Sequence, residues 1–187
     1  MKIVVISDIH GSEYWLSKAL KQIKDADRYI FLGDFLYHGP RNIIPEGYNP
    51  LKTSDIIKNT ENKSFVCGNC DAPVDNFLMG FSEPVYYSVE TYGDFKLFIT
   101  HGWDPDIKDS LKMAHKNKSD IILYGHTHIS GIENYENTVL FNPGSVALPK
   151  SGTPNSCGII ITEKNKLILN LYDIEKNEIY KKTELIK

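Results

Sequence analysis

Lys2-Ile-Val-Val-Ile-Ser-Asp-Ile-His10 joins a short apolar run to two side chains that commonly bind metal ions. The run at 2–6 is short and rich in β-branched residues, which favours a buried strand. Asp8 and His10 follow two residues apart, so on an extended chain they would point the same way. Helical spacing of apolar residues over 12–24, with Ser12 as a candidate N-cap, and a second apolar run at 28–32 predict a β-α-β start.

The remainder of the chain is expected to contain both helices and strands at first and then mainly β-strands. We expect a loop at 35–52, helices at 53–61 and 106–117, and strands at 64–67, 85–91, 95–100 and 120–124. Further strands are expected at 131–135, 138–141, 157–162, 166–172 and 177–184. Two sheets packed face to face, with helices outside, would accommodate both halves.

Several apolar runs end in polar side chains that could bind metal ions. These endings are Asp8-Ile-His10, Gly33-Asp34, Gly68-Asn69, His101-Gly102 and Gly125-His126-Thr-His128. The carboxyl ends of parallel strands gather at one edge of a sheet, where seven oxygen or nitrogen ligands would meet. A glycine beside a ligand lets the backbone turn sharply. One Asp-x-His or Gly-Asp is often ordinary structure, but the five endings together favour a metal site.

Ligands of this kind point to a particular chemistry. Carboxylate, amide and imidazole groups suit Mn²⁺, Fe or Zn²⁺ and argue against a thiolate site. Two ions roughly 3.5–4 Å apart can clamp the attacking and leaving oxygens of an in-line displacement. A hydroxide bridging them would be available near neutral pH. Asp8, Asp34 and that hydroxide would leave one positive charge to attract an anionic phosphate.

The ordered set of endings resembles the calcineurin-like metallophosphoesterase family over essentially the whole chain. The stretches His38-Gly-Pro-Arg-Asn42, Pro45-Glu-Gly-Tyr48 and Asn142-Pro-Gly-Ser145 are more similar to the bacterial YfcE-type phosphodiesterases. The resemblance implies an α/β fold, a four-layer α-β-β-α sandwich of two mixed sheets flanked by helices. It also implies two divalent ions per chain, with manganese the first choice and zinc or iron the alternatives. Asp8, His10 and His128 would hold one ion, Asn69, His101 and His126 the other, and Asp34 would bridge them.

One position departs from the wider family. Many relatives read Gly-Asn-His-Asp or Gly-Asn-His-Glu, and their histidine is the expected proton donor to the leaving group. This chain has Cys70 there, as in the YfcE-type subgroup. A thiol is a poorer donor at neutral pH than an imidazolium, so we expect aryl phosphodiesters to be preferred over alkyl esters. No catalytic residue beyond the metal ligands is assigned.

Other residues leave alternatives open. His38 and Arg41, in the loop after Asp34, could bind the substrate phosphate, Arg41 through its planar guanidinium, or could only fix the loop. Cys67 and Cys70 have a Cys-x-x-Cys spacing, but a zinc site would need more ligands and Cys67 fits a core position. In the same way, Trp103 could stack on an aromatic substrate or cover the sheet edge, and Asn142 could lie near the site or only shape its turn.

Composition limits the function classes. A chain of 187 residues, 41% apolar and 24% charged, suits one domain over 1–187. A net charge of −3 gives no basic footprint for duplex nucleic acid, and hence no support for a nuclease. The chain has no secretory or membrane-spanning run, so we expect a cytoplasmic protein.

We expect a metal-dependent phosphoesterase for small phosphate esters, in particular a phosphodiesterase. The alternative is a non-catalytic protein-binding scaffold, as in a retromer subunit that resembles this family. A homo-oligomer is left open.

Overall fold

A computed structural model describes residues 1–187 and arranges them in two packed sheets. The six-stranded sheet has the order β11-β10-β9-β1-β2-β3. Its strands are β1 (Lys2–Ile6), β2 (Arg28–Phe31), β3 (Lys63–Phe65), β9 (Ser156–Thr162), β10 (Lys166–Asp173) and β11 (Glu178–Ile186). The five-stranded sheet has the order β4-β5-β6-β8-β7. Its strands are β4 (Tyr87–Tyr92), β5 (Phe95–Thr100), β6 (Ile121–Leu123), β7 (Gly131–Tyr135) and β8 (Thr138–Asn142).

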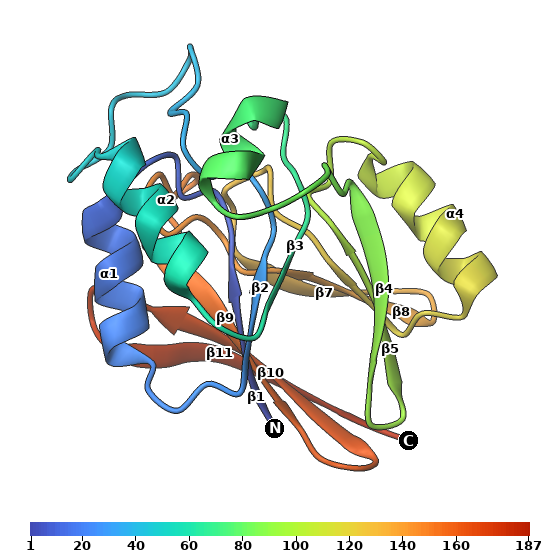
Figure 1. The fold of residues 1–187 in the computed structure, drawn as a ribbon. Helices are drawn as coiled ribbons and strands as arrows, with labels where there is room; N and C mark the ends of the chain where they lie inside the picture. Colours follow the sequence, from blue (N-terminus) through green and yellow to red (C-terminus); the bar gives the residue numbers. More distant parts are fainter.

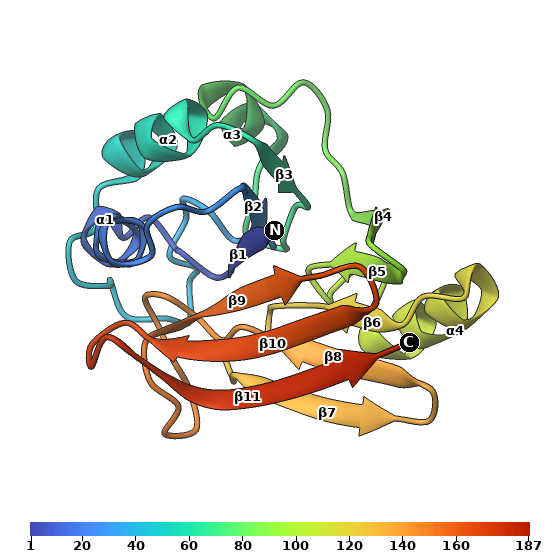
Figure 2. The same ribbon diagram turned by 90° about the horizontal axis from the view of Figure 1, so that it is seen from below.

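Helices cover the outer faces of both sheets (Figure 1). The six-stranded sheet is covered by α1 (Glu13–Gln22) and α2 (Pro50–Asn59), with α3 (Pro73–Leu78) beside them, and the five-stranded sheet by α4 (Ile107–Asn117). One buried cluster lies between the sheets, a second beneath α1 and α2, and a small third beneath α4. Figure 2 shows the two sheets face to face. The expected four-layer α-β-β-α sandwich is therefore confirmed.

Both sheets are mixed, and each contains three parallel strands side by side, at one end of the six-stranded sheet and at the centre of the five-stranded one. β1, β2 and β3 are parallel neighbours, as are β5, β6 and β8, while β9 runs antiparallel to β1. The carboxyl ends of the parallel strands meet across the two sheets. There the Nδ1 atom of His101, after β5, lies 2.5 Å from the carbonyl oxygen of Leu32, after β2. This common edge is where the polar endings come together.

The expected elements are present, with differences at their ends. α2 starts at Pro50 instead of 53, because the Asn49 side chain accepts a hydrogen bond from the Lys52 amide and Pro50 suits a first turn. β3 ends at Phe65, two residues earlier than expected. α3 was not expected, since it is six residues long and buries only Asn76. No helix in the structure is both long and apolar enough to span a membrane.

Candidate metal centre

Asp8 lies after β1 and is fully buried. Its Oδ2 accepts hydrogen bonds from the Ser7 hydroxyl at 2.7 Å and from the His126 amide at 3.1 Å. Its Oδ1 is buried without any hydrogen-bond donor and lies 3.4 Å from Nε2 of His128. Leaving a buried carboxylate oxygen without a partner is costly, and a cation at this position would remove that cost.

Three of the histidines are oriented by the same kind of contact. In each ring Nδ1 faces a backbone carbonyl oxygen: His10 faces Tyr37 at 2.7 Å, His101 faces Leu32 at 2.5 Å and His128 faces Leu148 at 2.6 Å. A carbonyl oxygen only accepts, so Nδ1 carries the proton and Nε2 presents its lone pair to the site. This is how metal-ligating histidines are fixed in other proteins.

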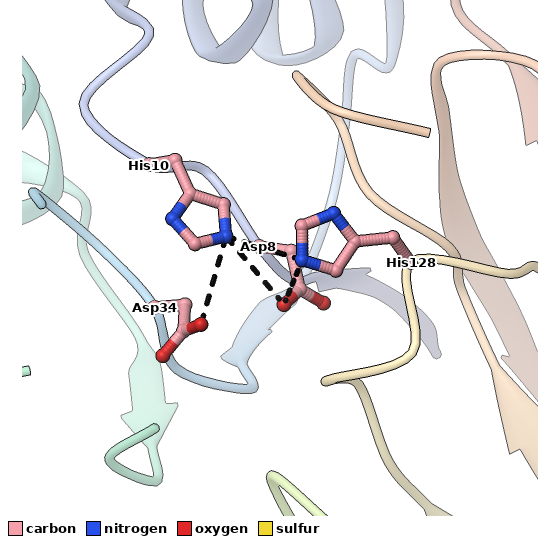
Figure 3. A group of neighbouring side chains, drawn as sticks. All are labelled: Asp8, His10, Asp34 and His128. Carbon is pink, nitrogen blue, oxygen red and sulfur yellow. Dashed lines mark hydrogen bonds and ion pairs between the residues drawn. The ribbon is translucent and has the colours of Figure 1, made fainter. Parts of the chain in front are cut away.

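The unprotonated nitrogens point at one another and at carboxylates (Figure 3). Nε2 of His10 lies 3.2 Å from Nε2 of His128 and 3.6 Å from Oδ2 of Asp34. One ligand atom from each of Asp8, His10, Asp34 and His128 falls within 4.8 Å of the others. With no proton between them these lone pairs repel, and a divalent cation among them would turn that repulsion into coordination. The donor set therefore fits a metal ion.

A second group of predicted ligands adjoins the first through Asp34. Its Oδ1 lies 3.5 Å from Nε2 of His101, which is 3.3 Å from Oδ1 of Asn69. The His126 ring lies beside that of His101, with 5.2 Å between centroids. The two carboxylate oxygens of Asp34 thus face different groups, Oδ2 toward His10 and Oδ1 toward His101. The structure brings all seven predicted ligands to one edge.

The backbone reaches this arrangement in a way that sequence spacing did not predict. Five of the seven candidates have left-handed backbone: Asp8, His10, Asp34, His126 and His128. The expectation of an extended Asp8–His10 segment was therefore wrong, because the chain turns sharply directly after the strand. Non-glycine residues rarely adopt this conformation, and when they do it is often at functional sites.

The pKa values of the four imidazoles are shifted in two opposite directions. Burial lowers the pKa of His10 and His126, and lowers that of His128 to about 4. Burial acts in the same direction on His101, but the Asp34 and Asp8 carboxylates outweigh it and raise its pKa. Three of the four rings thus favour the neutral form, which can bind a metal ion, more strongly than a free histidine does.

Asp71 joins the loops that follow β2 and β3. Its carboxylate accepts hydrogen bonds from the backbone amides of Asp34, Phe35 and Gly68 at 2.7–2.8 Å. Burial and the nearby Asp34 raise its pKa to about 7. No role was predicted for Asp71, although its position two residues after Asn69 indicates that it lies in the same loop.

A cavity of about 600 Å³ opens over the candidate ligands. Arg41 and Cys70 line it, and so does Lys150, which no sequence pattern had indicated. His38 is not among the lining residues, and its ring lies against those of Tyr37 and Tyr48.

The remaining candidates have different surroundings. Trp103 is exposed beside the His126 ring. Asn142 is buried and donates hydrogen bonds to the Gly125 carbonyl and the Thr127 hydroxyl, so it fixes the loop that carries His126 and His128. Cys67 is buried, and all three cysteines are free thiols.

Comparison with known proteins places this centre in a family. The sequence model of the calcineurin-like phosphoesterase superfamily domain matches residues 1–165. The chain belongs to this superfamily. Phosphodiesterase YfcE of Escherichia coli K12 is 38% identical over 165 residues, covering 86% of this chain and 87% of YfcE. The solved structure of YfcE, a phosphoesterase, matches with a TM-score of 0.85 at 31% identity over the full length of both chains.

These similarities confirm the predicted family and its phosphoesterase class. Vacuolar Protein Sorting 29 from Cryptosporidium parvum also matches, with a TM-score of 0.73, over 100% of this chain and 98% of its own. At 20% identity that match shows a shared fold only. The scaffold alternative thus gains no support beyond the fold itself.

Proposed function

We propose that residues 1–187 form a single-domain phosphodiesterase that uses two divalent cations, with manganese the first candidate, to hydrolyse small phosphate esters. The observation that carries this proposal is the placement of Asp34. One of its oxygens lies 3.6 Å from Nε2 of His10 and the other 3.5 Å from Nε2 of His101. A carboxylate between two sets of neutral ligands suits a bridging role between two ions.

The proposed ligand sets are those implied by the family. Asp8, His10 and His128 would hold one ion, Asn69, His101 and His126 the other, and Asp34 both. When bound, divalent cations would lower the pKa of coordinated water and offset the charge of the phosphate. The neutral amide and imidazole ligands matter here, because further carboxylates would cancel the positive charge that attracts the substrate.

Arg41 and Lys150 are proposed to orient the ester from the rim of the cavity. Both line the cavity that holds the candidate ligands. A guanidinium can bind two phosphate oxygens at once through its planar fork, whereas an ammonium acts as a compact point charge. His38, whose ring packs on Tyr48, is better placed to support the loop that carries Arg41.

We propose that the protein works in the cytoplasm. Neither a membrane nor duplex nucleic acid is proposed as a partner. The cytoplasm suits three free thiols, since a reducing compartment preserves them. All seven ligand positions carry side chains able to bind metal, so no observation favours the scaffold function over the enzyme.

The test is an activity screen with a matched pair of variants. The protein would be freed of metal with a chelator, then assayed on aryl phosphomonoesters and diesters with Mn²⁺, Zn²⁺, Fe²⁺ or Mg²⁺. Asp34→Asn should abolish turnover because both cations lose their shared carboxylate. Asp55→Asn, an exposed change of the same type on α2, should not affect it. Absence of hydrolysis with every ion, or full activity of Asp34→Asn, would refute the proposal.

A further inference from the structure

The cavity over the candidate ligands is called the metal cavity below. A second hollow, of about 350 Å³, adjoins it and has the opposite chemical character. Seven of its nine lining residues are hydrophobic, against two of eleven in the metal cavity. Its walls include Tyr37 and Tyr48 from the loop after β2, Leu51 at the start of α2 and Leu78 at the end of α3. We call it the apolar hollow.

The apolar hollow and the metal cavity share two walls. Tyr37 and Cys70 line both. The amide of Cys70 donates a hydrogen bond of 2.9 Å to Oδ1 of Asp34, so this shared boundary lies against the proposed bridging carboxylate. A group bonded to a phosphate at Asp34 would reach the apolar hollow by passing Cys70.

Charge separates the two spaces. Arg41 and Lys150 line the metal cavity, whereas the only charged side chain lining the apolar hollow is Asp75. An anionic group would be repelled there. Leu51 is 69% exposed and Leu78 46%, so an apolar ligand would remove hydrocarbon surface from water. Pockets of this size and lining typically hold small ring systems with a few polar contacts.

We infer that the apolar hollow binds the aromatic, uncharged part of the alcohol that leaves the phosphate. The inference rests on the proposed function, because it takes the ester to be cleaved at the neighbouring metal cavity. Under it, the preferred substrates are diesters of a ring-bearing alcohol. The Arg41 and Lys150 side of the cavity would receive the other, more polar half.

A second copy of this chain is the rival occupant, because more apolar surface lies nearby. Val74 and Phe77, also on α3, are 67% and 68% exposed but do not line the hollow. They provide controls on the same helix. A subunit interface would use these two side chains together with Leu51 and Leu78, whereas a leaving-group site would use only Leu51 and Leu78.

The experiment compares two methyl aryl phosphodiesters whose phenols have similar acidity but different size. One releases 4-nitrophenol and the other the bicyclic 4-methylumbelliferone. Hydrolysis would be measured with metal-loaded protein for wild type, Leu51→Ser, Leu78→Ser and the controls Val74→Ser and Phe77→Ser. Equilibrium binding of 4-methylumbelliferone, followed by fluorescence, gives a readout that does not require turnover. Light scattering gives the mass of each variant.

We expect wild type to favour the bicyclic ester, and Leu51→Ser and Leu78→Ser to lower its kcat/KM by roughly 5- to 10-fold, mainly through KM. On the smaller ester, kcat/KM of the two Leu variants should fall at most about twofold. The two controls should behave as wild type on both esters. 4-Methylumbelliferone should bind wild type more tightly than either Leu variant.

Two results would overturn the inference while leaving the proposed function intact. One is an unchanged ratio between the two esters in Leu51→Ser and Leu78→Ser. The other is a fall in mass in all four variants without a change in that ratio, which would assign the surface to a second copy. If no ester is hydrolysed with any ion, the proposed function fails instead, and the binding measurement still decides on the apolar hollow.

Discussion

Cys70 is the residue that we expect to restrict most strongly which esters this site can cleave. Burial and the nearby carboxylate of Asp34 raise its pKa to about 12. Such a thiol stays protonated at neutral pH but gives up its proton reluctantly, so it is a weak general acid. A leaving group that needs a proton would therefore depart slowly, whereas a phenolate can depart without one.

Replacing Cys70 by histidine tests this interpretation. In Cys70→His the imidazolium could donate a proton at neutral pH, so kcat/KM on alkyl phosphodiesters should rise by about tenfold or more. Activity on aryl phosphodiesters should change little, because their leaving groups need no proton. Steady-state kinetics on a matched alkyl and aryl pair would measure the difference. No gain on the alkyl ester, with metal content unchanged, would contradict the account.

The pKa values of the histidines predict a pH order for metal release. The pKa of His101 is raised, so its Nε2 binds a proton, and is lost as a ligand, early as pH falls. The pKa of His10 is lowered and that of His128 falls to about 4, so these rings keep their lone pairs in more acid solution. On the imidazoles alone, the position formed with Asn69 and His101 should therefore lose its ion before the position formed with His10 and His128, where burial raises the pKa of the third ligand, Asp8, and acts in the opposite direction.

Calorimetric titration of metal-free protein with Mn²⁺ or Zn²⁺, from neutral pH down to about pH 5, would resolve the two affinities. The metal affinity that falls less as pH decreases should be lost in His128→Gln. The affinity that falls more should be lost in His101→Gln. Affinities that fall in parallel over this range would show that the two positions do not titrate separately.

At the scale of elements, the loops after β2 and β3 are built to fit against each other. A Cβ on Gly33 would clash with the Gly68 amide nitrogen, and a Cβ on Gly68 would clash with Oδ1 of Asp34. Asp71 then ties the two loops together through three backbone amides. These contacts fix the direction of the Asp34 carboxylate.

Gly68→Ala should accordingly displace Asp34. We expect a loss of about 1–3 kcal/mol in the free energy of unfolding, since neither backbone can move away easily. A loss of roughly 10- to 100-fold in metal affinity should accompany it. Urea unfolding and metal titration would measure the two effects. Gly131→Ala is the matched control, because a Cβ there meets nothing closer than 3.7 Å. Equal effects of the two substitutions would refute the role given to Gly68.

Elements with a marked apolar pattern were predicted within one or two residues, and this covers the strands and α1. α2 began earlier than expected because its start depends on the Asn49 cap, a contact that periodicity does not report. α3 was missed because most of its side chains are exposed, so no apolar face marks it.

The same difference separates the site residues that were predicted from those that were missed. Residues placed directly after apolar runs were found, because strand ends gather at a common edge. Lys150 was not found, since its loop reaches the cavity only through tertiary folding, when its amide donates a hydrogen bond to the His128 carbonyl. The left-handed backbone at Asp8 and His10 was also beyond spacing arguments, because it depends on contacts such as the hydrogen bond from the His10 amide to the Asp34 carbonyl.

At the scale of the whole molecule, the candidate site lies across the junction of the two sheets. Asp8, His10, Asp34 and Asn69 follow strands of the six-stranded sheet, whereas His101, His126 and His128 follow strands of the five-stranded sheet. His128 approaches Asp8, and His101 approaches Asp34, so each proposed ion would join ligands from both sheets. Metal binding should therefore stabilise the packing of one sheet on the other.

This makes thermal stability a measure of the assembled centre. A ligand that binds only the folded state at 100 times its dissociation constant adds about 2.7 kcal/mol, which for a chain of this size raises Tm by roughly 5–10 °C. The gain should grow with metal concentration and be largely lost in Asp34→Asn but not in Asp55→Asn. Hydrogen exchange should slow in β1 and β5 together, because both sheets are held by the same ions. Protection confined to one sheet, or a Tm that does not depend on metal concentration, would mean that the ligands do not act across the junction.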